Sequence, residues 1–414
     1  MPPPPRSIIL VNATKVYPPR LLTALSSEAT VSVITLPEYA GRYPDVARLE
    51  LVSSLYDFGG VTRAAMEVAR EHGVDHVIGP AEMSVPAAGL LRSYFGIPGT
   101  GFETALSFSN KHLMKQRLRA AGLPVTDWVS VPSVERVPGT LSELGAPVVV
   151  KPVFGGGGQH TFVLKSAADA AALATSPHAA GLREAGCPVI VERFVEIINE
   201  YHCDGVVHDG EVRFAAVSRY FAPLLGQIGS VSGSHIVAAA DPVSGHVTDL
   251  HRSTVAALGL RSGVTHMELF ETSCGFLVGE ITCRPAGGGV PEVVLRQYGV
   301  DLWQAFTDTS LGRTPSAATD PATSTFAWVD MPIRPGRVAE LSSAEELATL
   351  PGVVEVEMHA AVGDVIGTHM HTSTTTARLY VSLDDVADLD QRLGDLSAAF
   401  RLEVEPMRAA VAHA

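Results

Sequence analysis

The sequence predicts a chain of mixed α/β and α+β class that is divided into three parts. Over the first hundred residues, short apolar runs alternate with amphipathic stretches, a pattern typical of a parallel sheet with helices on both faces. Strands joined by tight turns follow, and a polar segment of small residues at 313–324 separates them from a tail of further strands and helices. We expect a parallel-sheet domain over 1–108, a central domain over 109–313 and a small α+β module over 325–414.

In the first part, each apolar run is short enough to be a buried strand, and the second and third amphipathic stretches end at Gly73 and Gly96. No Gly-x-Gly-x-x-Gly follows a strand, so a dinucleotide-binding domain is not supported. The expected strands are 7–12, 31–36 and 74–79, and the expected helices are 20–25, 61–72 and 87–95.

In the second and third parts, a basic helix beginning at Lys111 is followed mainly by strands. The residues between two of these strands, 272–275, predict a tight turn and therefore an antiparallel hairpin. The expected strands are 147–152, 189–195, 208–213 with a turn at Asp209-Gly210, 265–270, 275–282, 325–333, 353–359 and 377–383, and the expected helices are 111–121, 343–350 and 384–398.

The overall charge limits the classes of partner. The 414 residues carry 44 acidic and 30 basic side chains, for a formal net charge of −14. This balance argues against a nucleic-acid partner, because phosphate-backbone binding depends on clustered lysine and arginine. Four scattered cysteines without a Cys-x-x-Cys pair predict neither a zinc framework nor a disulfide scaffold.

No segment resembles a targeting or membrane-spanning sequence. The charge-free stretch over 220–240 is interrupted by glycine and polar residues, which predicts a loop rather than a membrane span. The first residues, Met-Pro-Pro-Pro-Pro-Arg, lack the features of a signal peptide. We therefore expect a cytoplasmic protein with no membrane partner.

Four consecutive glycines follow the strand that ends near Lys151. Gly155, Gly156, Gly157 and Gly158 provide backbone N–H groups with no side chains in the way, which suits a cover for a polyphosphate. A flexible hairpin tip would have the same composition, and the glycines alone leave both interpretations open. The pattern Gly-x4-Gly-Lys-Ser/Thr is absent, which excludes a P-loop.

Two glutamates lie on the two arms of the predicted hairpin. Glu268 and Glu280 are twelve residues apart, and two carboxylates on one side would repel each other unless a cation lay between them. Magnesium held by carboxylates and substrate phosphates fits this arrangement. Arg284 would add a fixed positive charge for a phosphoryl group in transfer. The alternative, two exposed glutamates, agrees poorly with the apolar neighbours Met267, Leu269, Val278 and Ile281.

In order and spacing, these features resemble the ATP-grasp superfamily over about residues 75–300. The family pattern has one lysine opening a helix, a second lysine at a strand end, a glycine-rich flap, a hinge strand with an acidic residue, and three further glutamates with a terminal arginine. The matching residues are Lys111, Lys151, Gly155 to Gly158, Glu192 and Phe194 in Val-Glu-Arg-Phe, Glu200, Glu268, Glu280 and Arg284. The resemblance implies an ATP-grasp fold with an N-terminal Rossmann-like domain and a lid subdomain at about 125–195.

The resemblance also implies a role for each matching residue. Lys111 and Lys151 would hold the ATP phosphates beneath the glycine flap, Glu192 and the backbone near Phe194 would meet the adenine, and Glu200 the ribose. Glu268 and Glu280 would bind Mg²⁺, with Mn²⁺ as the alternative ion, and Arg284 would stabilise the moving phosphoryl group and the acyl phosphate. Where the family usually has asparagine, this chain has Thr282, whose hydroxyl can bind the metal or hold a metal-bound water.

Within the superfamily, the sequence is similar to the carboxylate–amine ligases that join amino acids. The loop Gly287-Gly288-Gly289-Val-Pro and the segments 331–336 and 350–353 carry this similarity. It implies an enzyme of EC 6.3 type that activates a carboxylate as an acyl phosphate and couples it to an amine. The implied product is a dipeptide or a γ-glutamyl-type compound, the implied substrates are amino acids, and a homodimer is the expected assembly.

Some alternatives remain open at this point. His235 either contacts substrate, where it could help to deprotonate the amine, or faces solvent on a loop. Another ATP-grasp ligation or carboxylation is the alternative reaction, and a nucleotide-binding protein without catalysis is the alternative class. The presence of both lysines, both glutamates and Arg284 argues against loss of catalysis.

Overall fold

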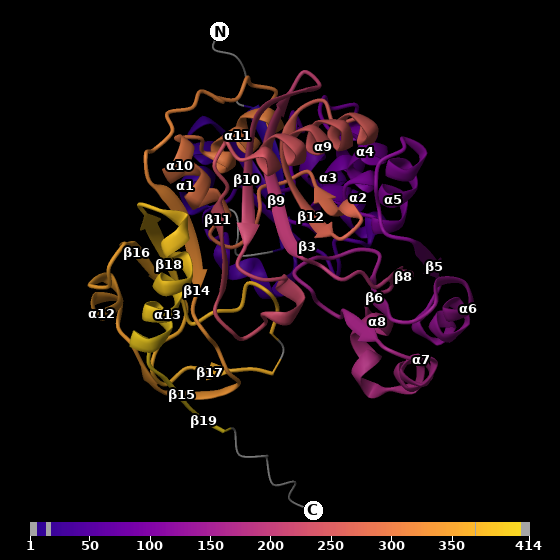
Figure 1. The fold of residues 1–414 in the computed structure, drawn as a ribbon. Coiled ribbons are helices and arrows are strands. Elements are labelled where there is room, and N and C mark those ends of the chain that lie inside the picture. The colour runs from indigo at the N-terminus through magenta and orange to yellow at the C-terminus, as the bar shows by residue number, and fades with distance from the viewer. Residues whose placement is uncertain (1–5, 14–17, 369, 407–414) are drawn as a thin grey trace, which may run out of the picture.

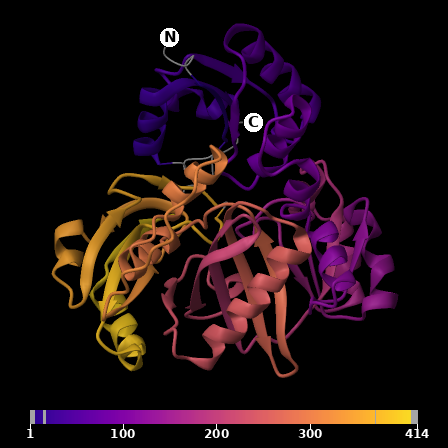
Figure 2. The same ribbon diagram turned by 90° about the horizontal axis from the view of Figure 1, so that it is seen from above.

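The computed structural model describes residues 6–13, 18–368 and 370–406, which form four β-sheets with helices packed on them (Figure 1). Seen from above, the N-terminal sheet and its helices lie beside both the segment expected to form the lid, about 125–195, and the C-terminal part (Figure 2). The mixed α/β and α+β class is confirmed. Among the described residues, no helix is both long and apolar enough to cross a bilayer.

The N-terminal sheet is parallel, with strand order β3-β2-β1-β4. Alternate side chains of β1 point to opposite faces: Ile8 and Leu10 pack with α1, and Ile9 and Val11 pack with α2 and α3. The prediction of a parallel sheet covered on both faces is therefore confirmed. Its elements are β1 (Arg6–Val11), α1 (Pro19–Glu28), β2 (Ala29–Thr35), β3 (Arg48–Leu51), α2 (Phe58–His72), β4 (His76–Ile78), α3 (Ser84–Phe95) and α4 (Phe102–Ser107).

A second sheet, here called the lid sheet, has the antiparallel order β5-β8-β6-β7 and lies within the segment expected to form the lid. Its core of valine and leucine packs against α7 and α8. Two of its strands deliver Lys151 and Glu192 to the same place. Its elements are β5 (Trp128–Val131), α6 (Leu141–Leu144), β6 (Val148–Pro152), β7 (Phe162–Leu164), α7 (Ala167–Thr175), α8 (Ala180–Glu184) and β8 (Val189–Arg193).

The largest sheet, here called the central sheet, is antiparallel with order β13-β12-β9-β10-β11-β14-β18-β16. One face packs on α5 and α9, while α10 and α11 cover only part of the other. The uncovered part of that second face is available to bind ligands. Its first elements are α5 (Lys111–Ala120), β9 (Asn199–His208), β10 (Glu211–Tyr220), β11 (Ser232–Ile236), α9 (Pro242–Leu258), β12 (Gly263–Thr272), β13 (Gly275–Thr282), α10 (Val290–Tyr298) and α11 (Leu302–Ser310).

The C-terminal residues extend this central sheet. β14 pairs with β11, and β18 and β16 follow, so one sheet crosses the polar segment at 313–324. β15, β17 and β19 form a separate three-stranded sheet. The remaining elements are β14 (Thr325–Asp330), β15 (Gly336–Leu341), α12 (Ala344–Ala348), β16 (Val353–Met358), β17 (Val365–Ile366), β18 (Ala377–Leu383), α13 (Leu389–Ala399) and β19 (Leu402–Glu405).

Two local predictions differ from the structure. The stretch 220–240 is not only a loop, because β11 forms inside it and is buried in the central sheet. The strand expected over 208–213 is divided by the turn at Asp209-Gly210 into the ends of β9 and β10. In both places, pairing with distant strands decided the outcome, which short-range patterns do not report.

Candidate active site

A cavity of about 360 Å³ opens on the uncovered face of the central sheet. The lid sheet and the glycine loop lie on one side of it, and residues of the N-terminal part and of the C-terminal loop 371–374 also line it. The lining includes most of the residues predicted from sequence: Lys111, Lys151, Gly155, Gly156, Gly157, Gly158, Glu192, Phe194, Glu200, Glu268, Glu280, Thr282, Arg284, Gly287 and Gly288. Gly289 and His235 are outside the lining.

The two hairpin glutamates face each other across β12 and β13. Glu268 and Glu280 are direct cross-strand partners, followed by a bulge. Burial opposes the charged form of both carboxyl groups. It raises the pKa of Glu280, although Lys111 Nζ lies 3.0 Å from Glu280 Oε1. At Glu268 the neighbouring His266 outweighs burial, and the pKa is lowered.

The donor set at this place fits a divalent cation. Thr282 Oγ1 is buried beside the two carboxylates and has no hydrogen-bond partner among the described residues. A buried polar atom without a partner is costly, and a cation or its bound water would satisfy it. Two carboxylates and a hydroxyl are oxygen ligands of the kind that magnesium prefers.

A buried row of charges links the lid sheet to α5. Lys151 Nζ lies 3.1 Å from Glu192 Oε1, and Lys115 Nζ lies 3.3 Å from Glu192 Oε2. The hydroxyl of Thr126 also donates to Glu192, at 2.9 Å. Burial would raise the pKa of Glu192, but the two lysines lower it to about 2. Glu192 therefore stays ionised and holds Lys151 at the cavity.

Sequence reasoning missed Lys115, and it placed Glu192 against the adenine. In the structure, Glu192 is engaged by Lys115, Lys151 and Thr126 instead. Lys115 is completely buried, which is unusual for an unpaired lysine and is explained by this carboxylate. Its position four residues after Lys111, on the same face of α5, was the available signal.

One end of the cavity is apolar and suits a flat ring. Glu200 lies next to it and accepts a hydrogen bond from the backbone N–H of Leu224 at 2.9 Å. Burial and the nearby Glu268 raise the pKa of Glu200 to about 8. The apolar lining includes Val149, Phe194, Ile197, Leu224, Leu225 and Phe270.

Arg284 is held in place by a residue from the N-terminal part. Its Nε and Nη2 donate to Glu82 Oε2 at 2.9 and 2.7 Å, and its Nη1 donates to the carbonyl of Pro285 at 2.8 Å. Glu82 follows β4, at the carboxyl edge of a parallel sheet, where ligand-binding residues commonly lie. Sequence reasoning missed it, although this location was a usable signal.

The glycine loop, Gly155 to Gly158, contacts two distant parts of the chain, the start of α5 and the C-terminal loop 371–374. Lys111 Nζ donates to the carbonyl of Gly155, and the backbone N–H of Thr372 donates to the carbonyl of Gly157 at 3.2 Å. A Cβ atom at Gly158 would approach Thr372 to 3.4 Å, and the φ of +68° there also favours glycine. The C-terminal loop 371–374 therefore lies directly on the glycine loop.

His235 requires a correction. It lies on β11, where Ser234 points to the cavity face and the next residue points to the opposite, packed face. The side chain is 4% exposed, and Nδ1 donates to the carbonyl of Ile236 at 2.9 Å. The structure does not bring His235 to the cavity, so we remove it from the site.

The buried His235 should make the protein sensitive to acid. Burial lowers its pKa from 6.5 to about 4, so its stabilising contribution is complete above pH 6.5 and is lost as the pH falls towards 4. The loss should reach about 3 kcal/mol. Urea unfolding of His235→Leu between pH 4 and 7 should show a shallower pH dependence than the parent, whereas the exposed-site control His178→Leu should match it. Equal slopes for His235→Leu and the parent would contradict the assignment.

Comparison with known proteins agrees with this geometry. Residues 116–293 match the model of the ATP-grasp domain, and residues 331–405 match that of the L-amino acid ligase C-terminal domain 2. The L-arginine-specific L-amino acid ligase of Bacillus subtilis is 32% identical over 96% of this chain and 97% of its own. The chain belongs to the L-amino acid ligase family. It is thus an ATP-dependent carboxylate–amine ligase that acts on small molecules.

Solved structures confirm the fold of the ligase. The crystal structure of an L-amino acid ligase from Bacillus licheniformis superposes with a TM-score of 0.76 at 18% identity, covering 97% of this chain and 99% of that chain. The carboxyaminoimidazole ribonucleotide synthase of Aspergillus clavatus, complexed with ATP, gives a TM-score of 0.71 at 15% identity, covering 96% and 99%. The ATP-grasp fold expected from sequence is confirmed.

Proposed function

We propose that this ligase joins two L-amino acids into a dipeptide, with Mg²⁺ as its metal and with release of ADP and phosphate. The observation that carries the proposal is the meeting of Lys111, Lys151, Glu268, Glu280 and Arg284 in one cavity. Loop 371–374, from the segment that matches the C-terminal ligase domain, lines the same cavity. This loop distinguishes the proposal from a general ATP-grasp ligation.

The charges in the cavity fit a reaction in two steps. A substrate carboxylate attacks the γ-phosphorus of ATP, and the bond to the ADP oxygen breaks to give an acyl phosphate. The neutral amine of the second amino acid then attacks the acyl carbon, and phosphate leaves with the bonding electrons and takes up the proton that the amine loses. Lys111, Lys151 and Arg284 would hold the phosphoryl oxygens while negative charge moves between them.

The other residues support these steps without forming a covalent bond. Glu268, Glu280 and Thr282 would hold Mg²⁺, which when bound neutralises phosphate charge. The glycine loop and loop 371–374 would exclude water, because water would hydrolyse the acyl phosphate. The apolar end would take the adenine, beside Phe194, with Glu200 near the ribose.

For the amino-acid end, the structure supports a site bounded by Arg284, Gly287 and Gly288. Trp328 forms a wall there, because a Cβ at Gly288 would lie 3.4 Å from its indole ring. Gly289 packs under the same residue and would support this wall. The B. subtilis relative is named for L-arginine, and we therefore propose arginine as the first substrate to test.

A pairwise screen of amino acids tests the proposed function. Purified protein with ATP and Mg²⁺ is assayed for phosphate release, and the products are identified by mass spectrometry. We expect equal amounts of phosphate and dipeptide for at least one pair, and neither product when EDTA replaces Mg²⁺. Phosphate without any amide, for every pair including those with arginine, would refute dipeptide synthesis. The homodimer stays a prediction, which sedimentation equilibrium can test.

A further inference from the structure

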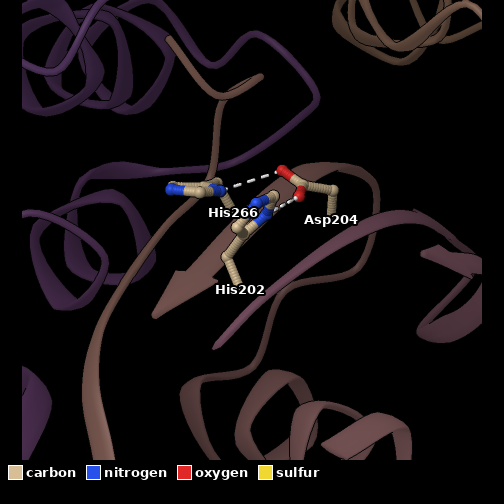
Figure 3. A group of neighbouring side chains, drawn as sticks. All are labelled: His202, Asp204 and His266. Carbon is tan, nitrogen blue, oxygen red and sulfur yellow. Dashed lines mark hydrogen bonds and ion pairs between the residues drawn. The ribbon is translucent and has the colours of Figure 1, made fainter. Parts of the chain in front are cut away.

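A row of buried polar side chains crosses the central sheet beneath the cavity. Asp204 lies at its centre: its Oδ2 accepts from His202 Nδ1 at 2.6 Å, and its Oδ1 accepts from His266 Nδ1 at 2.9 Å. Figure 3 shows the two carboxylate oxygens, each directed at one histidine. Asp204 and His202 are completely buried.

One arm of the row leads to the candidate metal ligands. His266 lies opposite Asp204 on the neighbouring strand, and its second nitrogen, Nε2, lies 3.6 Å from Glu268 Oε1. The imidazole therefore has a carboxylate at each end. Glu268 in turn faces Glu280 across the hairpin, so a rotation of His266 would be felt at the metal site.

The other arm leads to the amino-acid end. His202 donates to Asp204 from Nδ1, so its Nε2 accepts from the hydroxyl of Ser234, at 2.8 Å. Ser234 Oγ accepts in turn from Trp328 Nε1, also at 2.8 Å. Trp328 is the wall against Gly288 and Gly289. The arm therefore runs from Trp328 through Ser234 and His202 to the same carboxylate, that of Asp204.

We propose that Asp204 is a positioning residue of the ligase, which sets the metal end of the cavity through His266 and the amino-acid end through His202, Ser234 and Trp328. The proposal rests on the proposed function. Its physical basis is that every member lies on a strand of one sheet and is held by a buried partner. Partners behind ligating groups commonly change metal affinity or activity by about 10–100-fold.

Variants that break one arm at a time test the coupling. Ser234→Ala should raise the KM for the amino acid next to Trp328 by about tenfold and leave the Mg²⁺ concentration for half-maximal activity unchanged. His266→Gln should raise that Mg²⁺ concentration by about tenfold and leave the same KM unchanged. Asp204→Asn should change both, and lower kcat by about 10–100-fold.

The control is a buried hydrogen bond between a histidine and a threonine on the other side of the sheet. His251 Nε2 and Thr265 Oγ1 are 2.7 Å apart, and both residues are fully buried. Thr265→Val should lower the melting temperature without altering KM, the Mg²⁺ requirement or kcat. If Asp204→Asn behaves in this way, it is only structural and the proposal is wrong.

Further outcomes remain distinguishable. If Asp204→Asn fails to fold, Ser234→Ala and His266→Gln still test the proposal. A variant that changes both the amino-acid KM and the Mg²⁺ requirement, or neither of them, would contradict two separate arms. One tightly bound zinc per purified chain would make His202, Asp204 and His266 a metal centre and overturn the positioning role. An inactive parent protein would refute the proposed function, not the coupling.

Discussion

Replacing Arg284 by alanine is expected to lower kcat by about 10³-fold, because the variant loses a guanidinium that Glu82 holds at the cavity. The side chain is 17% exposed, and its fork is oriented before substrate arrives by Glu82 and the carbonyl of Pro285. Lysine at this position keeps the charge but loses the fork, so Arg284→Lys should give an intermediate kcat. Phosphate release with an active amino-acid pair measures the effect.

Glu82→Gln is the matched control for this prediction. It weakens the same ion pair but keeps the guanidinium, so it should lower kcat only about tenfold. Both variants should remain folded in circular dichroism, with a loss of at most about 3 kcal/mol because the pair is not completely buried. Equal activity losses in the two folded variants would contradict a role for the guanidinium beyond its pairing with Glu82.

Glu280→Gln is expected to lower kcat by at least about 100-fold while leaving the ligand-free protein as stable as the parent, or more stable. Burial raises the pKa of Glu280, so keeping it ionised at neutral pH costs folding free energy that glutamine does not require. The loss of its pairing with Lys111 partly offsets this gain. Phosphate release and the melting temperature measure the two effects.

Ligand-induced stabilisation gives an independent readout for the same variant. ATP with Mg²⁺ should raise the melting temperature of the parent by more than that of Glu280→Gln, since only binding to the folded state stabilises it. Glu271→Gln is the control: Glu271 lies on the same hairpin, outside the cavity, where it accepts from Asn199 Nδ2 at 2.7 Å. A Glu280→Gln protein with parental kcat would refute the assigned metal site.

The hairpin shows what sequence can predict well. A tight turn at 272–275 and alternating side chains predict the two strands. The turn alone would set Glu268 opposite Gly279, and the bulge between Glu268 and Leu269 brings Glu280 opposite Glu268 instead. The prediction used only residues within twenty positions of one another. Lys111 and Lys151 were likewise found because each begins or ends a recognisable element.

Residues whose role depends on distant partners could not be found in this way. Asp204 meets His266 only because β9 and β12 are adjacent, and Glu82 meets Arg284 only because two sheets are packed together. His235 shows the same limit: alternation along β11 separates Ser234 from His235, but only the assembled sheet tells which face holds the cavity.

The C-terminal boundary has a similar explanation. A polar segment at 313–324 looks like a linker, yet the strands on either side of it join one sheet. The pairing of β14 with β11 is invisible to composition, because β11 consists mostly of glycine and polar residues and looks like a loop. Residues before and after the segment, such as Arg284 and Trp328, therefore line the same cavity.

The hydrogen bond between Thr372 and Gly157 has a consequence for how quickly nucleotide can be exchanged. Both residues line the cavity, so ATP entering or ADP leaving past them has to wait for the two loops to separate. A single hydrogen bond contributes only about 1 kcal/mol, so such openings should be frequent and brief. Opening of loop 371–374 would then set the rate of nucleotide exchange, since the closed loop keeps the reactants enclosed while the amide forms and the open loop releases ADP.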